Sequence, residues 1–396
     1  MPFDPWYVVL LAGLSIPALL LAGGRHDLLP YLAAYFFLFG FGPVISHLLG
    51  GTIYFGTNPL LIDRAALGLL LAFAGVLAAG LLVRQRRDLQ DPRQSTAERQ
   101  LPLVPVVLAA LSLYATLVLL WGGTRFLSGG KIDHIAVAGP GHYDYLLLEL
   151  CACALYYLAQ ETAAGRFTYR LNLAVYIAYC LATGERDFVF VLFTLVLHRE
   201  LVRGERGLPR PVLWGAGLLL GATALFSLRG GGSASSEQIL NQGSVLFVDT
   251  WVMTHVPSVE PYQHGVTYLH ALINLVPGHP QVPLQQWLVD RYAPGSSSGY
   301  GFSLTGEAYL NFGLAGIPVM FALLTVVQRL LVNRLDKAPV YAYGSLLFSV
   351  AWMYGFRGES LSLLKTCVYG LLFYGVIRLV SVKEPAAKEV QPCASS

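Results

Sequence analysis

Charged side chains are scarce in this sequence. Asp, Glu, Lys and Arg make up 12% of the 396 residues, whereas a soluble domain carries about 25%. A large core does not explain the shortfall, because a surface in contact with water still requires charge. Apolar runs of roughly 17 to 23 residues recur along the chain, each long enough to cross a bilayer as a helix. The sequence therefore predicts an all-α polytopic membrane protein, with residues 1–396 as a single integral membrane domain.

Motifs that hold metals or nucleotides are also missing. The sequence has no Asp-x-Asp pair, a common way to hold a divalent metal against a nucleotide-sugar diphosphate, and no glycine-rich nucleotide loop. Its basic residues sit in short loops rather than on one polar face, so no nucleic-acid partner is expected. None of the five cysteines lies in the long segment 229–306, so no disulfide framework is expected. We expect neither a metal nor a cofactor.

About eleven spans are expected. Their approximate ranges are 7–23, 28–49, 60–83, 102–121, 142–160, 171–183, 188–198, 211–228, 307–328, 340–355 and 360–380. Lys and Arg gather in alternate loops, namely 84–101, 161–170, 199–211 and 329–339, and in the C-terminal tail. Because short cytoplasmic loops are rich in these residues, we expect the N-terminus outside and the C-terminus in the cytoplasm.

Residues 171–198 are expected to form a hairpin of two short helices. One long helix would put two basic loops on opposite sides and the charges of Glu185, Arg186 and Asp187 at mid-bilayer. The arms 171–183 and 188–198 would be only about 20 Å and 16 Å long, so the turn is expected within the outer half of the membrane. Polar backbone at that depth is tolerated only against protein or water, which predicts a cavity open to the outside.

The segment 229–306, between the eighth and ninth spans, is predicted to be one large external loop. Two amphipathic pieces within it, Val245–Val256 and Pro283–Tyr292, are expected to be short helices lying along the membrane surface. A loop of this length is more often functional than a simple linker.

Three arginines lie at the expected outer ends of spans: Arg186, Arg229 and Arg357. Arginine is always charged and binds phosphate oxygens with a two-pronged fork, so three of them around one external cavity would suit a diphosphate. Taken singly, Arg229 and Arg357 are equally well explained by snorkelling to lipid headgroups. Arg186 has a second explanation as well, a local ion pair with an acidic neighbour.

Two residues are candidates for a general base. Glu307 begins the ninth span, where a carboxylate either stabilises the helix dipole or, in a low-dielectric cavity, takes up a proton. His264 in the external loop has a pKa suited to neutral chemistry, although most loop histidines are simply solvated. The aromatic side chains Tyr268, Tyr300 and Tyr309 are candidates for stacking on an acceptor sugar, and interfacial belts give the same composition.

Several short motifs carry a resemblance to a known family. They are Thr183–Arg186, Ser227–Gly230, Gly265–Tyr268, Val276–Gly278 and Gly306–Gly313. Together with the span count and the single large external loop, these motifs make the chain similar to the Wzy-type oligosaccharide repeat-unit polymerases. These are the O-antigen polymerases of bacterial inner membranes, which act in lipopolysaccharide biosynthesis.

The resemblance implies a metal-independent glycosyltransferase of GT-C-like architecture, with a periplasmic N-terminus and a cytoplasmic C-terminus. It would move a growing glycan from undecaprenyl diphosphate onto a new lipid-linked oligosaccharide, with inversion. Membrane lipids are expected partners, and a chain-length regulator is a candidate one. Arg186, Arg229 and Arg357 would bind the donor diphosphate, and Glu307 or His264 would take the acceptor proton. An O-antigen ligase, or a non-enzymatic transporter or flippase of lipid-linked sugar, remains an alternative, although a transporter would be expected to show repeat symmetry.

Overall fold

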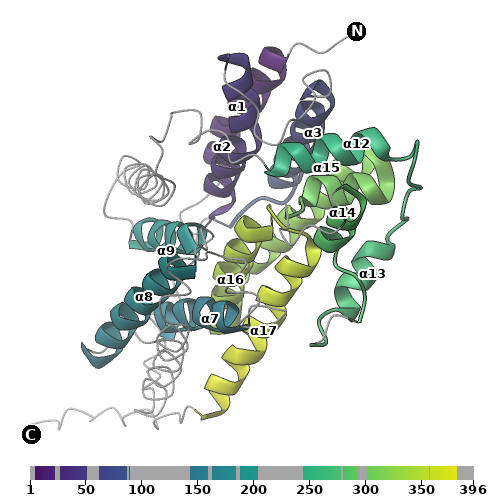
Figure 1. Ribbon diagram of the computed structural model, residues 1–396. Coiled ribbons are helices and arrows are strands. Elements are labelled where there is room, and N and C mark those ends of the chain that lie inside the picture. Colours follow the sequence, from purple (N-terminus) through teal and green to yellow (C-terminus); the bar gives the residue numbers. More distant parts are fainter. Residues whose placement is uncertain are drawn as a thin grey trace, which may run out of the picture.

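The fold was analysed in a computed structural model. It describes residues 5–22, 27–50, 62–86, 89, 143–158, 163–183, 188–203, 244–277, 280–292, 294, 301–355 and 357–380. Within these ranges all regular secondary structure is helical (Figure 1). The predicted spans 102–121 and 211–228 lie outside the described residues.

Six helices begin and end within two residues of a predicted span. They are α1 (Pro5–Ala22), α2 (Leu29–Leu48), α3 (Ile62–Leu82), α7 (Tyr143–Leu158), α16 (Pro339–Gly355) and α17 (Ser360–Val380). Among the described residues, α3 and α15 (Leu304–Val332) are long and apolar enough by themselves to cross a membrane, and α1, α7 and α17 contain shorter apolar stretches. The positions of the apolar runs in the sequence therefore predicted the boundaries of these six helices correctly.

The expected short hairpin is longer than predicted. Its two helices are α8 (Ala163–Thr183) and α9 (Phe188–Arg203). The prediction of two helices instead of a single long one is confirmed, but α8 begins well before residue 171. With 21 residues, α8 is roughly 31 Å long and matches the hydrocarbon thickness. The prediction that both arms are too short to cross the membrane was wrong for α8. Arg166 and Arg170 were assigned to a loop, but arginine favours helix, and both lie within α8 with exposed side chains. The turn itself lies outside the described residues.

Two hydrophobic clusters hold the helices together. The first joins α1, α2, α3, α15 and α12 (Ser244–His255), and the second joins α7, α8, α9 and α17. Helix α16 contributes side chains to both clusters. The closest helix contact is between α3 and α15, where a β-carbon at Gly75 would overlap the backbone of Pro318, so only glycine permits this approach.

Helix α15 is broken near its beginning. Phe312 (φ −136°, ψ 15°) and Gly313 (φ 64°, ψ −157°) leave the helical conformation, so a short first segment precedes a longer second one. Gly313 is in the left-handed region that favours glycine. The predicted ninth span therefore consists of two pieces, and the first of them carries Glu307.

The far end of α15 is joined to α2 by a buried ion pair. Asp27, just before α2, lies 2.5 Å from Nη1 of Arg329, and both side chains are completely buried. The other oxygen of Asp27 accepts a hydrogen bond of 3.0 Å from the backbone N–H of Leu29, where a carboxylate stabilises the start of a helix.

Two basic loops meet at the same end. Asn333, just after α15, donates to the carbonyl oxygen of Arg84 at 3.0 Å and accepts from the backbone N–H of Arg86 at 2.9 Å. Arg86 also forms an ion pair of 2.9 Å with Asp336. Both loops were predicted to be cytoplasmic, and they lie at the end of α15 away from Glu307.

Three helices form the described part of the segment 229–306. They are α12, α13 (Val266–Ile273) and α14 (Leu284–Tyr292), and they gather beside the N-terminal half of α15 and α17 (Figure 1). The bounds of α12 and α14 match the prediction closely, whereas α13 was not predicted. Leu246 and Val248 are completely buried, and α12 packs against α2, α3 and α15, so the expectation that it lies along the membrane surface stays a prediction.

Candidate functional site

Glu307 is the centre of the polar cluster at the N-terminal end of α15. Its side chain is 1% exposed. Oε1 accepts hydrogen bonds from the hydroxyls of Thr267, at 2.9 Å, and Ser360, at 2.7 Å, and Oε2 accepts one from the backbone N–H of Ser360, at 2.7 Å. Glu307 therefore binds the N-terminus of α17, not its own helix, and links three segments that are far apart in sequence.

Asn311 joins α13 to the first segment of α15. Its amide nitrogen donates to the hydroxyl of Thr267 at 2.7 Å and to the carbonyl oxygen of Glu307 at 2.8 Å. Its amide oxygen accepts from the backbone N–H of Gly265 at 2.7 Å. The motifs Gly265–Tyr268 and Gly306–Gly313 are thus in direct contact, although about forty residues separate them in the sequence.

Two glycines allow these motifs to meet. Gly265 has φ 93° and begins α13, and Gly313 has φ 64° at the break in α15. A β-carbon at Gly313 would lie 3.1 Å from the hydroxyl of Tyr262. Both positions lie in the left-handed region, where other residues are strained, so the turn geometry requires glycine at each.

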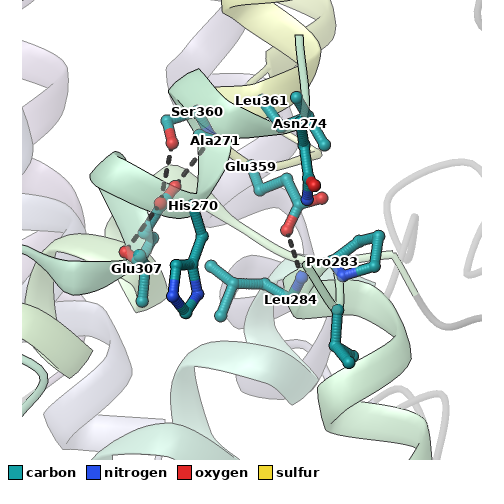
Figure 2. Close-up of a pocket in the computed structure, with 11 residues that line it drawn as sticks. His270, Ala271, Asn274, Pro283, Leu284, Glu307, Glu359, Ser360 and Leu361 are labelled. Carbon is teal, nitrogen blue, oxygen red and sulfur yellow. Dashed lines mark hydrogen bonds between the residues drawn. The ribbon is translucent and has the colours of Figure 1, made fainter. Parts of the chain in front are cut away.

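A second buried carboxylate lies beside Glu307. Oε2 of Glu359 accepts a 2.7 Å hydrogen bond from the backbone N–H of Leu284, at the start of α14 (Figure 2). Burial raises the pKa of Glu359 to about 8, and the charge of the neighbouring Glu307 adds to the rise. Glu359 therefore keeps its proton at neutral pH, while its position still connects α14 to the start of α17.

The two carboxylates line one small cavity. It is lined by residues from α13, α14, α15 and the start of α17, among them His270, Glu307 and Glu359 (Figure 2). Its volume of about 20 Å³ has room for about one water molecule. The cavity is partly open, so it has room for a hydroxyl group but not for a whole sugar ring.

The proton on Glu359 should make stability depend on pH. The folded protein holds this proton up to about pH 8, whereas an unfolded chain releases it near the ordinary pKa of a glutamate. The stability that the proton contributes to the folded protein is therefore complete below the ordinary pKa, and it is lost as the pH rises from there to about 8. Glu359→Gln removes the titration and keeps the oxygen that accepts from Leu284. We expect the variant to gain stability relative to the wild type between pH 5 and pH 8, by on the order of 3 kcal/mol.

Thermal unfolding of both proteins over this pH range checks the expectation. The midpoint difference should grow with pH, because only the wild type loses stability from this group. A difference that stays constant with pH would mean that Glu359 is already ionised in the folded protein.

The remaining predicted site residues have mixed outcomes. Arg357 is partly buried, three residues before Ser360, and its carbonyl oxygen faces Gly301. His264 is exposed at φ 47°, and only its backbone N–H, which donates to the carbonyl oxygen of Asn311 at 3.2 Å, joins the cluster. Arg186, Arg229 and Tyr300 lie outside the described residues, so the grouping of the three arginines stays a prediction.

The two described tyrosines contact different aromatic side chains. Tyr268 stacks on Phe312 with ring centroids 6.5 Å apart. Tyr309 donates to the carbonyl oxygen of Val256 at 3.3 Å and contacts Tyr262 edge to face. The role of both tyrosines in acceptor binding stays a prediction.

Several polar residues of the site were not predicted. Ser360, Glu359 and His270 all line the cavity with Glu307, and Asn311 and Thr267 were noted only as letters of motifs. Ser360 and Glu359 lie in the short polar connection between two apolar spans, next to the start of the second span. That position is the sequence signal that could have indicated them. Among the described residues, no group of three or more His, Cys, Asp or Glu side chains is arranged to hold a metal ion.

One comparison with known proteins finds a match. Residues 282–384 match the model of the family described as O-antigen polysaccharide polymerase Wzy. The match covers about a quarter of the chain and contains α14 to α17, with Glu307, Arg357, Glu359 and Ser360. No curated protein and no solved structure matches the chain significantly.

Proposed function

We propose that this protein polymerises lipid-linked oligosaccharide repeat units at the periplasmic face of the inner membrane, as a glycosyltransferase-type enzyme. The match of residues 282–384 to the O-antigen polysaccharide polymerase Wzy family supports this proposal. A match to this family supports a polytopic membrane protein and a lipid-linked oligosaccharide substrate. The donor in this proposal is a growing glycan on undecaprenyl diphosphate, and the acceptor is the next lipid-linked unit. The proposed fold is a GT-C-like bundle of about eleven spans.

The environment of Glu307 is the observation that supports the reaction best. A carboxylate has about four accepting positions, and Glu307 uses three of them for Thr267 and Ser360. One position remains on Oε2, enough to accept the hydrogen bond of a sugar hydroxyl. A carboxylate fixed in this way is oriented before substrate arrives, which is what general base catalysis requires.

The proposed chemistry is a single displacement. The acceptor hydroxyl oxygen forms a bond to the anomeric carbon of the donor sugar, and the bond from that carbon to the diphosphate oxygen breaks. The undecaprenyl diphosphate leaves with the electron pair, and the hydroxyl proton passes to Glu307 or to His264. Attack opposite the leaving group inverts the anomeric centre.

The leaving diphosphate requires positive charge, which the three arginines would supply. Arg357 lies in the turn that leads into α17, close in sequence to both Glu359 and Ser360. Negative charge that develops on the diphosphate is stabilised by a fixed guanidinium in a low-dielectric site. We propose that Arg357 acts with Arg186 and Arg229, and that the three surround one cavity.

The arrangement of the loops supports the proposed sidedness. The loops around Arg86 and Asn333 contact each other at one end of α15, and both are rich in basic residues, as cytoplasmic loops are. Glu307 and helices α12 to α14 lie at the other end. We therefore propose that the site faces the periplasm, with the N-terminus on the same side and the C-terminus in the cytoplasm.

The test is reconstitution with a defined substrate. Purified protein is mixed with a lipid-linked repeat unit, without nucleotide sugars, and the glycans are separated on a gel. A ladder of lengths is expected. Transfer onto a lipid core without a ladder would indicate a ligase, and unchanged substrate that crosses a vesicle membrane would indicate a transporter. Either result would overturn the proposal, provided that the repeat unit is the one that the host makes.

A further inference from the structure

A long stretch of the predicted external loop carries no charge. From residue 261 to residue 289 the sequence has no Asp, Glu, Lys or Arg. A segment in contact with water carries charge on about a quarter of its residues. The stretch contains α13 and the connection to α14, so no charged side chain opposes contact between α13 and lipid.

Helix α13 has two different faces. One face packs inward, where Thr267 binds Glu307 and Ala271 is 4% exposed. The opposite face and the residues that follow it expose large apolar side chains. These are Val266, Leu269, Leu272, Ile273 and Val276, each between 37% and 62% exposed. In water, an apolar face of this kind gains none of the roughly 25 cal/mol per Å² that burial of apolar surface contributes, and a contiguous exposed apolar patch marks a protein or membrane interaction site.

The C-terminal end of α13 reaches far along α17. The hydroxyl of Tyr369 donates a hydrogen bond to the carbonyl oxygen of Leu275. Tyr369 is nine positions beyond Ser360, the first residue of α17, which corresponds to roughly 14 Å along the helix axis. Helix α13 therefore runs from the Glu307 cluster toward the middle of α17, where a spanning helix is surrounded by lipid chains.

The helices that contact α13 also expose apolar side chains. α13 packs against α17 and α15, and Leu372 and Val376 of α17 and Val319 of α15 are each at least 59% exposed. The apolar face of α13 thus adjoins two helices that expose apolar side chains at the same depth or deeper.

We propose that α13 and the residues after it, 266–277, are inserted into the outer leaflet, with the exposed face of α13 against lipid acyl chains. The inserted helix forms one wall of the cavity beside Glu307. The site is then separated from the bilayer by a single short helix, and its wall can move into lipid without crossing water. Insertion does not depend on the polymerase activity, because it concerns only where this helix lies.

The test compares two single-cysteine variants. Leu272→Cys lies on the proposed lipid face, and Val259→Cys, 71% exposed just before the uncharged stretch, is the control. The background carries Cys367→Ala and Cys393→Ser, and the remaining cysteines, Cys151, Cys153 and Cys180, are buried. In proteoliposomes, the cysteine at 272 should react many-fold more slowly with a membrane-impermeant maleimide than the one at 259. A bimane attached at 272, and not at 259, should be quenched by phospholipids brominated on their acyl chains.

Two results would overturn the proposal. Equal maleimide rates at both positions would mean that α13 faces water. A slow rate at 272 without quenching by brominated lipid would mean that protein, such as a second copy of this chain, covers the face. Leu269→Cys repeats the measurement on the same face, in case Leu272→Cys does not give a monodisperse protein. A protein that is labelled as expected but makes no glycan ladder would support the insertion and contradict only the proposed function.

Discussion

Glu307→Gln is expected to abolish the glycan ladder, with a loss of at least about a hundredfold in rate. The variant keeps the size of the side chain but loses the carboxylate that is proposed to take the acceptor proton. It also replaces one accepting oxygen with an amide that donates, which conflicts with the donors Thr267 and Ser360. The ladder assay with purified, monodisperse protein measures the effect.

Two matched variants make this result specific. Glu260→Gln removes a carboxylate whose partner Arg291 is half exposed, and such surface pairs contribute little, so its ladder should be unchanged. His264→Ala separates the two candidate bases, because its ladder should persist if Glu307 takes the proton. An active Glu307→Gln together with an inactive His264→Ala would assign the base to His264 and leave Glu307 a structural link between helices.

Arg329→Met is expected to lower the free energy of unfolding by about 3–5 kcal/mol, because it leaves the carboxylate of Asp27 buried without a partner. Both side chains are completely buried in the wild type, so water cannot replace the lost guanidinium. The expected signs are a lower thermal midpoint and a smaller monodisperse fraction after detergent extraction. Lys337→Met, which removes an exposed basic residue shortly after α15, should have little effect.

A double variant separates the buried charge from the shape of the side chains. Asp27→Asn with Arg329→Met buries no charge, and the asparagine oxygen still accepts from the N–H of Leu29. We expect it to recover most of the stability that the single variant loses. If the double variant is as unstable as the single one, the packing of Arg329 matters and the ion pair does not.

The sequence predicted the helices better than their contacts. The apolar runs fixed α1, α2, α3, α16 and α17 because the thickness of a bilayer sets the length of a span. Helix α13 was missed, because its eight residues are too few for a helical period to be recognised. The break in α15 was also missed, since Gly313 lies within a long apolar run and only its left-handed conformation reveals the break.

The candidate site was predicted in part. Glu307 was chosen as a charge at the start of a span, and it is buried there, while its role as a base stays a prediction. Its partners Thr267 and Ser360 are about forty residues before and fifty residues after it, and hydrogen bonds over such separations leave no local pattern in a sequence. The proton on Glu359 depends on burial by helices that are distant in the chain, so composition alone does not indicate it.

The break in α15 also constrains the chain that precedes α13. Where a helix stops, its last carbonyl groups lose their partners, and here those of Leu310 and Asn311 accept from the backbone N–H groups of Gln263 and His264, at 3.0 Å and 3.2 Å. These bonds use main-chain atoms only, so they tolerate many different side chains but not a change in the number of residues. In the connection between α12 and α13, an inserted or deleted residue should therefore be more disruptive than most substitutions, apart from those at Gly265.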